Sequence, residues 1–169
     1  MPTPDRVPCL GVDVGNVIID HAGYGTTKET FDSLDFNLIP PVEGVIGALT
    51  RLNKLFNGNI FSVYKATDVA DEKMLKWFEH HRFSARTGIP LSRVHRTTDG
   101  RNKYPMCERY GATHFVDDRL EVLGHLVGKV NHLYLFRPQP QEITRFAKFR
   151  HRVQVVKSWN QIEFLAHPR

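Results

Sequence analysis

The chain has little cysteine and no long apolar run, and both features limit what the protein can be. Its two cysteines, Cys9 and Cys107, are too few for a disulfide framework, which is a feature of oxidising compartments. No apolar stretch approaches the roughly 18 to 20 residues that a membrane-spanning helix needs. Residues 1–5 lack the basic and apolar segments of a secretory signal. We therefore expect a cytoplasmic protein with buried thiols and no membrane partner.

The composition is that of an ordinary globular protein with a basic surface. Of the 169 residues, 41% are hydrophobic and 24% are charged, and no repeat or Gly/Ser-rich linker divides them; residues 1–169 are expected to form one domain. The formal net charge of +5 favours an anionic partner, which is a phosphorylated small molecule, a nucleotide or a nucleic acid. Residues 145–152 combine aromatics at helical spacing with cations. They predict a core-packing helix whose basic outer face is the candidate nucleic-acid contact.

Short apolar runs alternate with amphipathic segments of helical length. This alternation predicts an α/β fold in which a mostly parallel sheet lies between two layers of helices. Pro41 suits the first turn of a helix that runs to about Phe56. Residues 19–41 are expected to form a loop-rich excursion or a minimal cap, which leaves the crevice open. Strands are expected at residues 9–14, 59–64, 94–97, 113–116 and 132–136, with an edge strand at 153–156.

Polar side chains fall at the expected carboxyl ends of the strands or at the start of the helix that follows. These residues are Asp13, Ser62 or Tyr64, Lys103, Asp117 and Asp118. Because parallel α/β sheets bind ligands beyond the carboxyl ends of their strands, these side chains are expected to face one crevice. Carboxylates and a backbone carbonyl are oxygen ligands of the kind that Mg²⁺ prefers. Lysine and Mg²⁺ together would neutralise a phosphoryl group while an aspartate attacks it.

Four stretches in this order resemble the motifs of the haloacid dehalogenase superfamily of phosphohydrolases. They are "VDVGNVI", "IFSVYKAT", "NKYP" and "HFVDDR". The resemblance extends over about residues 7–136. It implies a Rossmann-like sheet and a Mg²⁺-dependent hydrolase of phosphomonoesters that works through an aspartyl-phosphate.

Carried over position by position, the resemblance implies a role for each matching residue. Asp13 would be the nucleophile and also a Mg²⁺ ligand, and Gly15 would lend its carbonyl to the metal. Asp118 would bind the metal directly, with Asp117 behind it. Lys103 would steady the nucleophile and the phosphoryl oxygens.

The sequence departs from the superfamily pattern at two places. Gly15 stands where an aspartate typically protonates the leaving group, a form of help that is typically worth ~10²- to 10⁴-fold in rate. Asp20 or His21, just beyond the motif, is the hypothetical replacement. The hydroxyl of the second motif is either Ser62 or Tyr64, and Asn16 is a further candidate for substrate binding.

These departures define the rival function. A protein that keeps the phosphate and metal pocket but has lost turnover would have the same four motifs. A nucleic-acid-associated module that uses residues 145–152 is the third reading. Retention of Asp13, Lys103 and Asp118 together favours the hydrolase.

Overall fold

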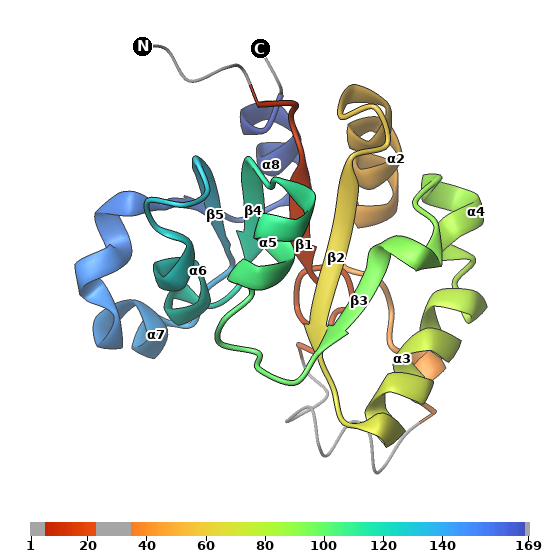
Figure 1. Ribbon diagram of the computed structural model, residues 1–169. Coiled ribbons are helices and arrows are strands. Elements are labelled where there is room, and N and C mark those ends of the chain that lie inside the picture. Colours follow the sequence, from red (N-terminus) through yellow and green to blue (C-terminus); the bar gives the residue numbers. More distant parts are fainter. Residues whose placement is uncertain (1–5, 23–34, 168–169) are drawn as a thin grey trace.

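The computed structural model describes residues 6–22 and 35–167. Within them, six parallel strands form one sheet in the order β3-β2-β1-β4-β5-β6 (Figure 1). The chain winds outwards from β1 to β3 and then crosses to β4, so β1 and β4 flank the switch point at which such sheets bind ligands. The strands are β1 (Leu10–Asp13), β2 (Ile60–Lys65), β3 (Val94–Thr97), β4 (His114–Asp117), β5 (His132–Phe136) and β6 (Gln154–Val156).

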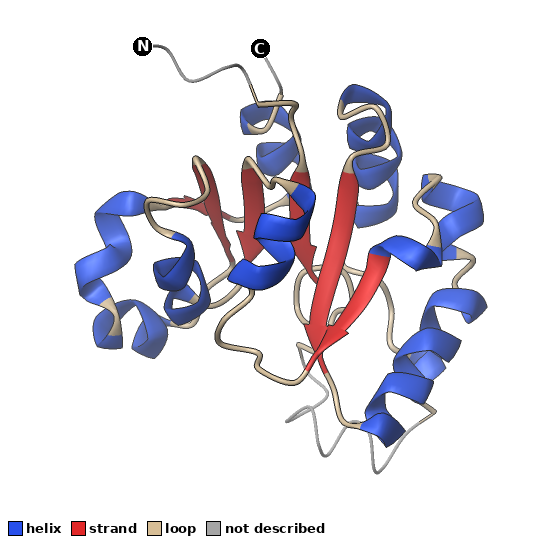
Figure 2. Cartoon of the chain, in the orientation of Figure 1, coloured by secondary structure: helices blue, strands red, loops and turns tan. Residues whose placement is uncertain are grey.

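Helices cover both faces of the sheet, which confirms the predicted three-layer α/β fold (Figure 2). One buried cluster joins the strands to α2 (Val45–Leu55), α3 (Asp68–His80), α4 (Phe83–Thr87) and α8 (Trp159–Leu165). A second cluster joins them to α5 (Tyr104–Tyr110), α6 (Leu120–Leu126) and α7 (Pro140–Arg145). No helix of the described segments is long and apolar enough to cross a membrane.

Turn and cap residues set several element boundaries as the sequence indicates. Asn57 and Gly58, with φ angles of 51° and 77°, turn the chain from α2 into β2. The Thr67 hydroxyl caps α3 by accepting a hydrogen bond from the backbone N–H of Ala70. Gly111 ends α5 with a φ of 65°, a conformation that glycine adopts without strain.

A close approach of two aromatic rings requires glycine in the middle of β1. A Cβ atom on Gly11 would lie 2.3 Å from Cδ2 of Phe115 and 2.7 Å from Cζ of Phe61. The two rings come from the neighbouring strands β4 and β2 and pack over the strand at this point. The Phe115 ring also lies 5.9 Å from the ammonium of Lys103. Gly11 therefore leaves room for the Phe61 and Phe115 rings, which pack next to the polar residues at the carboxyl end of the sheet.

Both thiols are buried, as predicted. Burial raises the pKa of Cys9 to about 11 and the pKa of Cys107 to about 12. Because the thiolate is the reactive form, neither cysteine is an activated nucleophile.

Two predicted helices are wrong in their bounds. Pro41 does not open α2; it pairs with Ile19 in an isolated bridge, and the helix begins at Val45 after Gly44 in the left-handed region. The basic segment is not one helix, because α7 ends at Arg145 and a 3-10 helix covers Ala147–Arg152. Its division into two faces is confirmed, since its phenylalanines pack against the core while its arginines are exposed.

The predicted excursion over residues 19–41 lies partly outside the described residues, since these exclude 23–34. On its described sides, the chain pairs Ile19 with Pro41 and forms a 3-10 helix at Phe36–Leu38. The short helix α8 was not predicted, and α3 and α4 together fill a segment in which one continuous helix was predicted.

A buried histidine, His114, makes stability depend on pH. His114 on β4 stacks on His132 of β5, with ring centroids 4.4 Å apart. Burial, and then the neighbouring His132, lower the pKa of His114 to about 4. The unfolded chain takes up this proton near pH 6.5, whereas the folded protein resists it down to about pH 4. The free energy of unfolding is therefore expected to fall over this window by up to about 3 kcal/mol on account of this residue.

His114→Phe removes the titrating group and keeps an apolar ring of similar size. Urea unfolding at pH 7 and pH 4.5 is expected to show a smaller acid-induced loss in this variant than in the wild type. His151→Gln, at an exposed position, serves as the control and should lose as much stability as the wild type. An equal loss in the wild type and His114→Phe would contradict the assignment.

Candidate active site

A tight loop holds the chain at the carboxyl end of β1. The carbonyl oxygen of Val14 accepts hydrogen bonds from the N–H groups of Ile18 and Ile19, at 2.8 and 3.0 Å. Asn16 takes a φ of 59°, and its N–H donates to the Ile19 carbonyl at 2.8 Å. The indole N–H of Trp159 on α8 donates to the Val17 carbonyl at 2.9 Å. The loop therefore turns back over the end of the strand and is fixed from α8.

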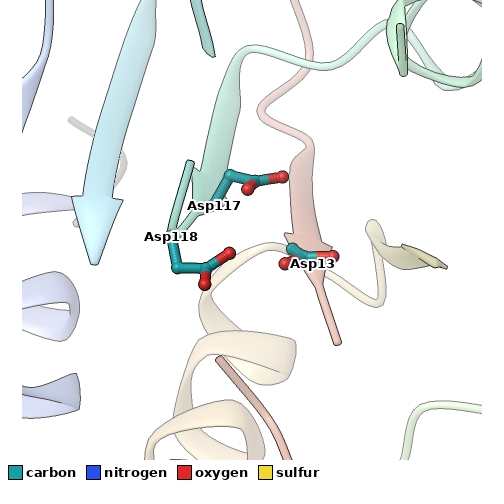
Figure 3. Close-up of side chains that lie close together, drawn as sticks. All are labelled: Asp13, Asp117 and Asp118. Atoms are coloured by element: carbon teal, nitrogen blue, oxygen red, sulfur yellow. The ribbon is translucent and has the colours of Figure 1, made fainter. Parts of the chain in front are cut away.

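Three aspartates meet where β1 and β4 end. Figure 3 shows the side chains of Asp13, Asp117 and Asp118 turned towards one another. Each offers a carboxylate oxygen within 4.8 Å of the others. The first two are buried and Asp118 is partly exposed. Parallel pairing of β1 with β4 places the two strand ends side by side, so the meeting follows from the sheet register.

Lys103 links two of these carboxylates. Its ammonium donates to Oδ1 of Asp13 at 2.5 Å and to Oδ2 of Asp117 at 2.8 Å. The residue is the N-cap of α5, the helix that lies in front of β1 and β4 in Figure 1, and it is only 4% exposed. The helix thus delivers one positive charge into a buried carboxylate cluster.

The charges of the cluster shift its pKa values. Burial by itself would lower the pKa of Lys103, but the charges of Asp117 and Asp13 outweigh it and raise the pKa above its ordinary value. Burial, followed by the charge of Asp13, raises the pKa of Asp117 to about 6. Burial and the charges of Asp13 and Asp117 also raise the pKa of Asp118. One lysine therefore does not neutralise three crowded carboxylates.

The donor set fits a Mg²⁺ ion. Three hard carboxylate oxygens lie close together, they carry more negative charge than Lys103 balances, and Mg²⁺ binds through one or two carboxylates while keeping waters. Both oxygens of Asp117 already accept hydrogen bonds, from Lys103 and from the N–H of Arg119 at 3.0 Å. Within the described segments, Asp118 accepts only a long bond, of 3.4 Å, from the Asn16 amide. Asp13 and Asp118 are therefore the freer ligands.

A pocket of about 210 Å³ opens beside the cluster. Seven of the predicted site residues line it, which are Asp13, Gly15, Asn16, Tyr64, Lys103, Asp117 and Asp118. Lys65 and Met74 line it as well and were not predicted. The place of Lys65 directly after Tyr64 at the strand end was an available signal. Met74 belongs to the apolar stripe of α3, and nothing in the sequence indicated that it lines a site.

Ser62 does not line this pocket, which corrects its prediction as a substrate-binding residue. Its side chain is buried within β2 and is 1% exposed. Alternation places it on the same face of the strand as Ile60 and Tyr64, which pack in the cluster under α2 and α3. Its hydroxyl has no hydrogen-bond partner among the described residues. It lies three residues before the end of β2 at Lys65 and is not among the residues that line the pocket.

Tyr64 lines the pocket with its ring while its hydroxyl is engaged elsewhere. The phenol donates a hydrogen bond to the Asp71 carboxylate on α3. Asp71 is in turn 3.9 Å from Arg96 on β3. Burial and then the Asp71 bond raise the pKa of Tyr64 above its ordinary value. The ring therefore forms a wall of the pocket, and the phenol is not a free donor.

Comparison with known proteins supports the fold. No family model matches the chain, and no curated protein matches it. A protein of Burkholderia xenovorans LB400 that is classed as a haloacid dehalogenase-like hydrolase superposes with a TM-score of 0.61 at 13% identity, over 97% of this chain and 99% of its own. DsGPDH of Dunaliella salina superposes with a TM-score of 0.54 at 13% identity, over 93% of this chain and 28% of its own. The chain therefore has the haloacid dehalogenase-like fold, as its four motifs predicted.

The buried lysine makes the cluster sensitive to substitution. Lys103→Met keeps the length of the side chain but leaves Asp13 and Asp117 buried without their partner. Removing one member of a buried ion pair typically costs about 3 to 5 kcal/mol, and a loss of this size is expected in urea unfolding at pH 7. Lys76→Met, which removes an exposed pair with Glu72, should cost less than about 1 kcal/mol. A similarly small loss of stability in both variants would contradict the stabilising role of Lys103.

Binding of Mg²⁺ is expected to raise the midpoint of thermal unfolding, because the ion binds the folded cluster and not the unfolded chain. Asp118→Asn removes the freest carboxylate and should abolish most of that rise. The exposed Glu79→Gln is the matched control and should keep it. A rise that persists in Asp118→Asn would exclude this cluster as the binding site.

Proposed function

We propose that the protein is a Mg²⁺-dependent phosphohydrolase that cleaves phosphomonoesters through an aspartyl-phosphate at Asp13. One observation carries the proposal. Asp13 lines a pocket, and its carboxylate is held by the buried Lys103 and lies beside two further carboxylates. The combination of a fixed carboxylate, a cation and a candidate metal site is what attack on a phosphoryl group requires.

Each residue then has a distinct task. Asp13 attacks phosphorus with one carboxylate oxygen while Lys103 fixes the other, since the lysine binds Oδ1. The same ammonium neutralises charge on the phosphoryl oxygens. Asp117 holds the lysine in place through its 2.8 Å bond. Asp13, Asp118 and the Gly15 carbonyl would hold Mg²⁺, which when bound supplies positive charge to the phosphoryl group.

The pocket limits what the substrate presents to Asp13. Its volume of about 210 Å³ is below the ~300 to 1,000 Å³ of a site that encloses a drug-sized ligand. It accommodates a phosphoryl group and the atoms next to it, with the rest of the substrate outside. A phosphorylated small molecule or a nucleotide fits this description. The Tyr64 ring and Met74 give the pocket an apolar side against which a flat leaving group packs.

Phosphate binding without turnover is the second candidate. Two observations favour it. Gly15 supplies no carboxylate at the position where the superfamily resemblance places an acid. The hydroxyl of Tyr64, a candidate for the phosphate-binding position of the second motif, is already bonded to Asp71 and is not free to bind phosphate. Under this candidate the same pocket would bind Mg²⁺ and phosphate and release no product.

Turnover by wild type and Asp13→Asn distinguishes the two candidates. The substrates are an aryl phosphate, an acyl phosphate, nucleotides and a phosphorylated oligonucleotide, each with and without Mg²⁺. Phosphate release is expected to require Mg²⁺ and to fall by about 10³-fold or more in Asp13→Asn, because loss of a nucleophile removes the covalent route. Glu79→Gln should retain the wild-type rate. Mg²⁺ binding with no release from any substrate would establish the second candidate, and full activity of Asp13→Asn would refute the proposed mechanism.

A further inference from the structure

His21 lies beside the position that a side chain at residue 15 would take. Among the described residues, a Cβ atom built on Gly15 would contact this imidazole alone, with Cδ2 at 3.6 Å and Nε2 at 3.7 Å, which are ordinary van der Waals distances. The Cδ2–Nε2 edge of the ring therefore faces Gly15. Both residues line the pocket that contains Asp13 and Lys103. The ring thus lies on the same side of the pocket as a side chain at position 15 would.

The loop holds this ring firmly. His21 is 5% exposed, its N–H donates to the Ile19 carbonyl at 3.1 Å, and its ring lies 5.8 Å from that of Phe36. The preceding N–H, of Asp20, donates to the Pro40 carbonyl at 2.9 Å. The loop that turns back over β1 therefore presents a fixed imidazole to the pocket.

The other nitrogen of the ring is left without a partner. Nδ1 of His21 is buried and makes no hydrogen bond to any part of the described chain. An unpaired buried polar atom typically costs about 1 to 3 kcal/mol, so packing and hydrogen bonding alone do not account for histidine here. The histidine is explained if its Nε2 meets a ligand in the pocket.

The neighbouring acid does not fill the same position. Asp20 is not among the residues that line the pocket. Its carboxylate oxygen Oδ1 accepts a hydrogen bond from the N–H of Ala22 at 3.1 Å, which is a local turn contact. Of the two residues that follow the first motif and carry a proton donor or acceptor, only His21 reaches the site.

We infer that His21 is a catalytic residue that takes the place of the carboxylate missing at position 15. The inference rests on the proposed hydrolase function. In the first half-reaction Asp13 forms a bond to phosphorus, the bond from phosphorus to the leaving-group oxygen breaks, and that oxygen takes the proton of Nε2. In the second, water attacks phosphorus and gives its proton back to Nε2. The bond to Asp13 then breaks, which releases phosphate and restores the carboxylate.

A series of leaving groups tests this role. The substrates are an alkyl phosphate, whose alkoxide needs a proton, and 2,4-dinitrophenyl phosphate, whose phenolate does not. His21→Ala is expected to lower kcat/KM, which reports the steps up to loss of the leaving group, by about 10²-fold or more for the alkyl ester and by less than about 10-fold for the dinitrophenyl ester. His21→Gln keeps the volume and a hydrogen-bond donor but transfers no proton, and it should show the same pattern. His151→Gln controls for loss of an exposed histidine.

A double variant tests whether a carboxylate at position 15 replaces His21. Gly15→Asp combined with His21→Ala restores an acid on that side of the pocket and removes the ring that occupies it. This double variant is expected to recover at least about 10-fold of the alkyl-ester rate that His21→Ala loses. Loss of structure alone would not be repaired by adding a carboxylate at another position.

The outcomes distinguish failure of the role of His21 from failure of the proposed hydrolase function. Asp13-dependent release whose kcat/KM falls equally for both esters, or does not fall, in His21→Ala and His21→Gln would overturn the role of His21 as the proton donor and leave the hydrolase standing. Absence of release from both esters by the wild-type protein would overturn the hydrolase, and the role of His21 with it. The expected pattern is a loss that grows as the leaving group becomes poorer.

Discussion

The buried ion cluster of Lys103 with Asp13 and Asp117 is the interaction on which the site depends. A lysine that is 4% exposed is stable there only because two carboxylates meet it at 2.5 and 2.8 Å. The cluster ties the end of β1, the end of β4 and the start of α5 to one point. It also fixes the oxygen of Asp13 that is not available for attack. Structure and proposed chemistry therefore depend on the same three side chains.

Around this cluster, the loop after β1 determines what the site is able to do. The loop is closed by the carbonyl of Val14 and fixed by Trp159 on α8. It brings the His21 ring beside Gly15, where a Cβ atom would lie in van der Waals contact with it. Tyr64 also lines the pocket, and its phenol is bonded to Asp71 and so is not a free donor. The two departures from the superfamily pattern thus have separate structural counterparts.

The sequence predicted the sheet and the acidic cluster because their signals are local. Apolar runs mark the strands, and a carboxylate that follows such a run falls at the strand end by necessity. It did not separate Ser62 from Tyr64, because β2 is buried on both faces and its residues show no alternation of polarity. Nor did it place His21, whose position depends on Trp159, a residue 138 positions away in the chain (159 − 21). The prediction of a helix start at Pro41 was wrong because a proline suits a first helical turn and an irregular bridge equally well.

Chemical trapping of the phosphorylated side chain tests the central role of Asp13 most directly. The protein in excess over an aryl phosphate is mixed with Mg²⁺, quenched within one turnover and treated with borohydride, which reduces an acyl phosphate to an alcohol. Peptide mass spectrometry then locates the reduced residue. The mechanism predicts reduction at Asp13 and at none of the other aspartates. Turnover of the ester with Asp13 unmodified at every quench time would contradict it.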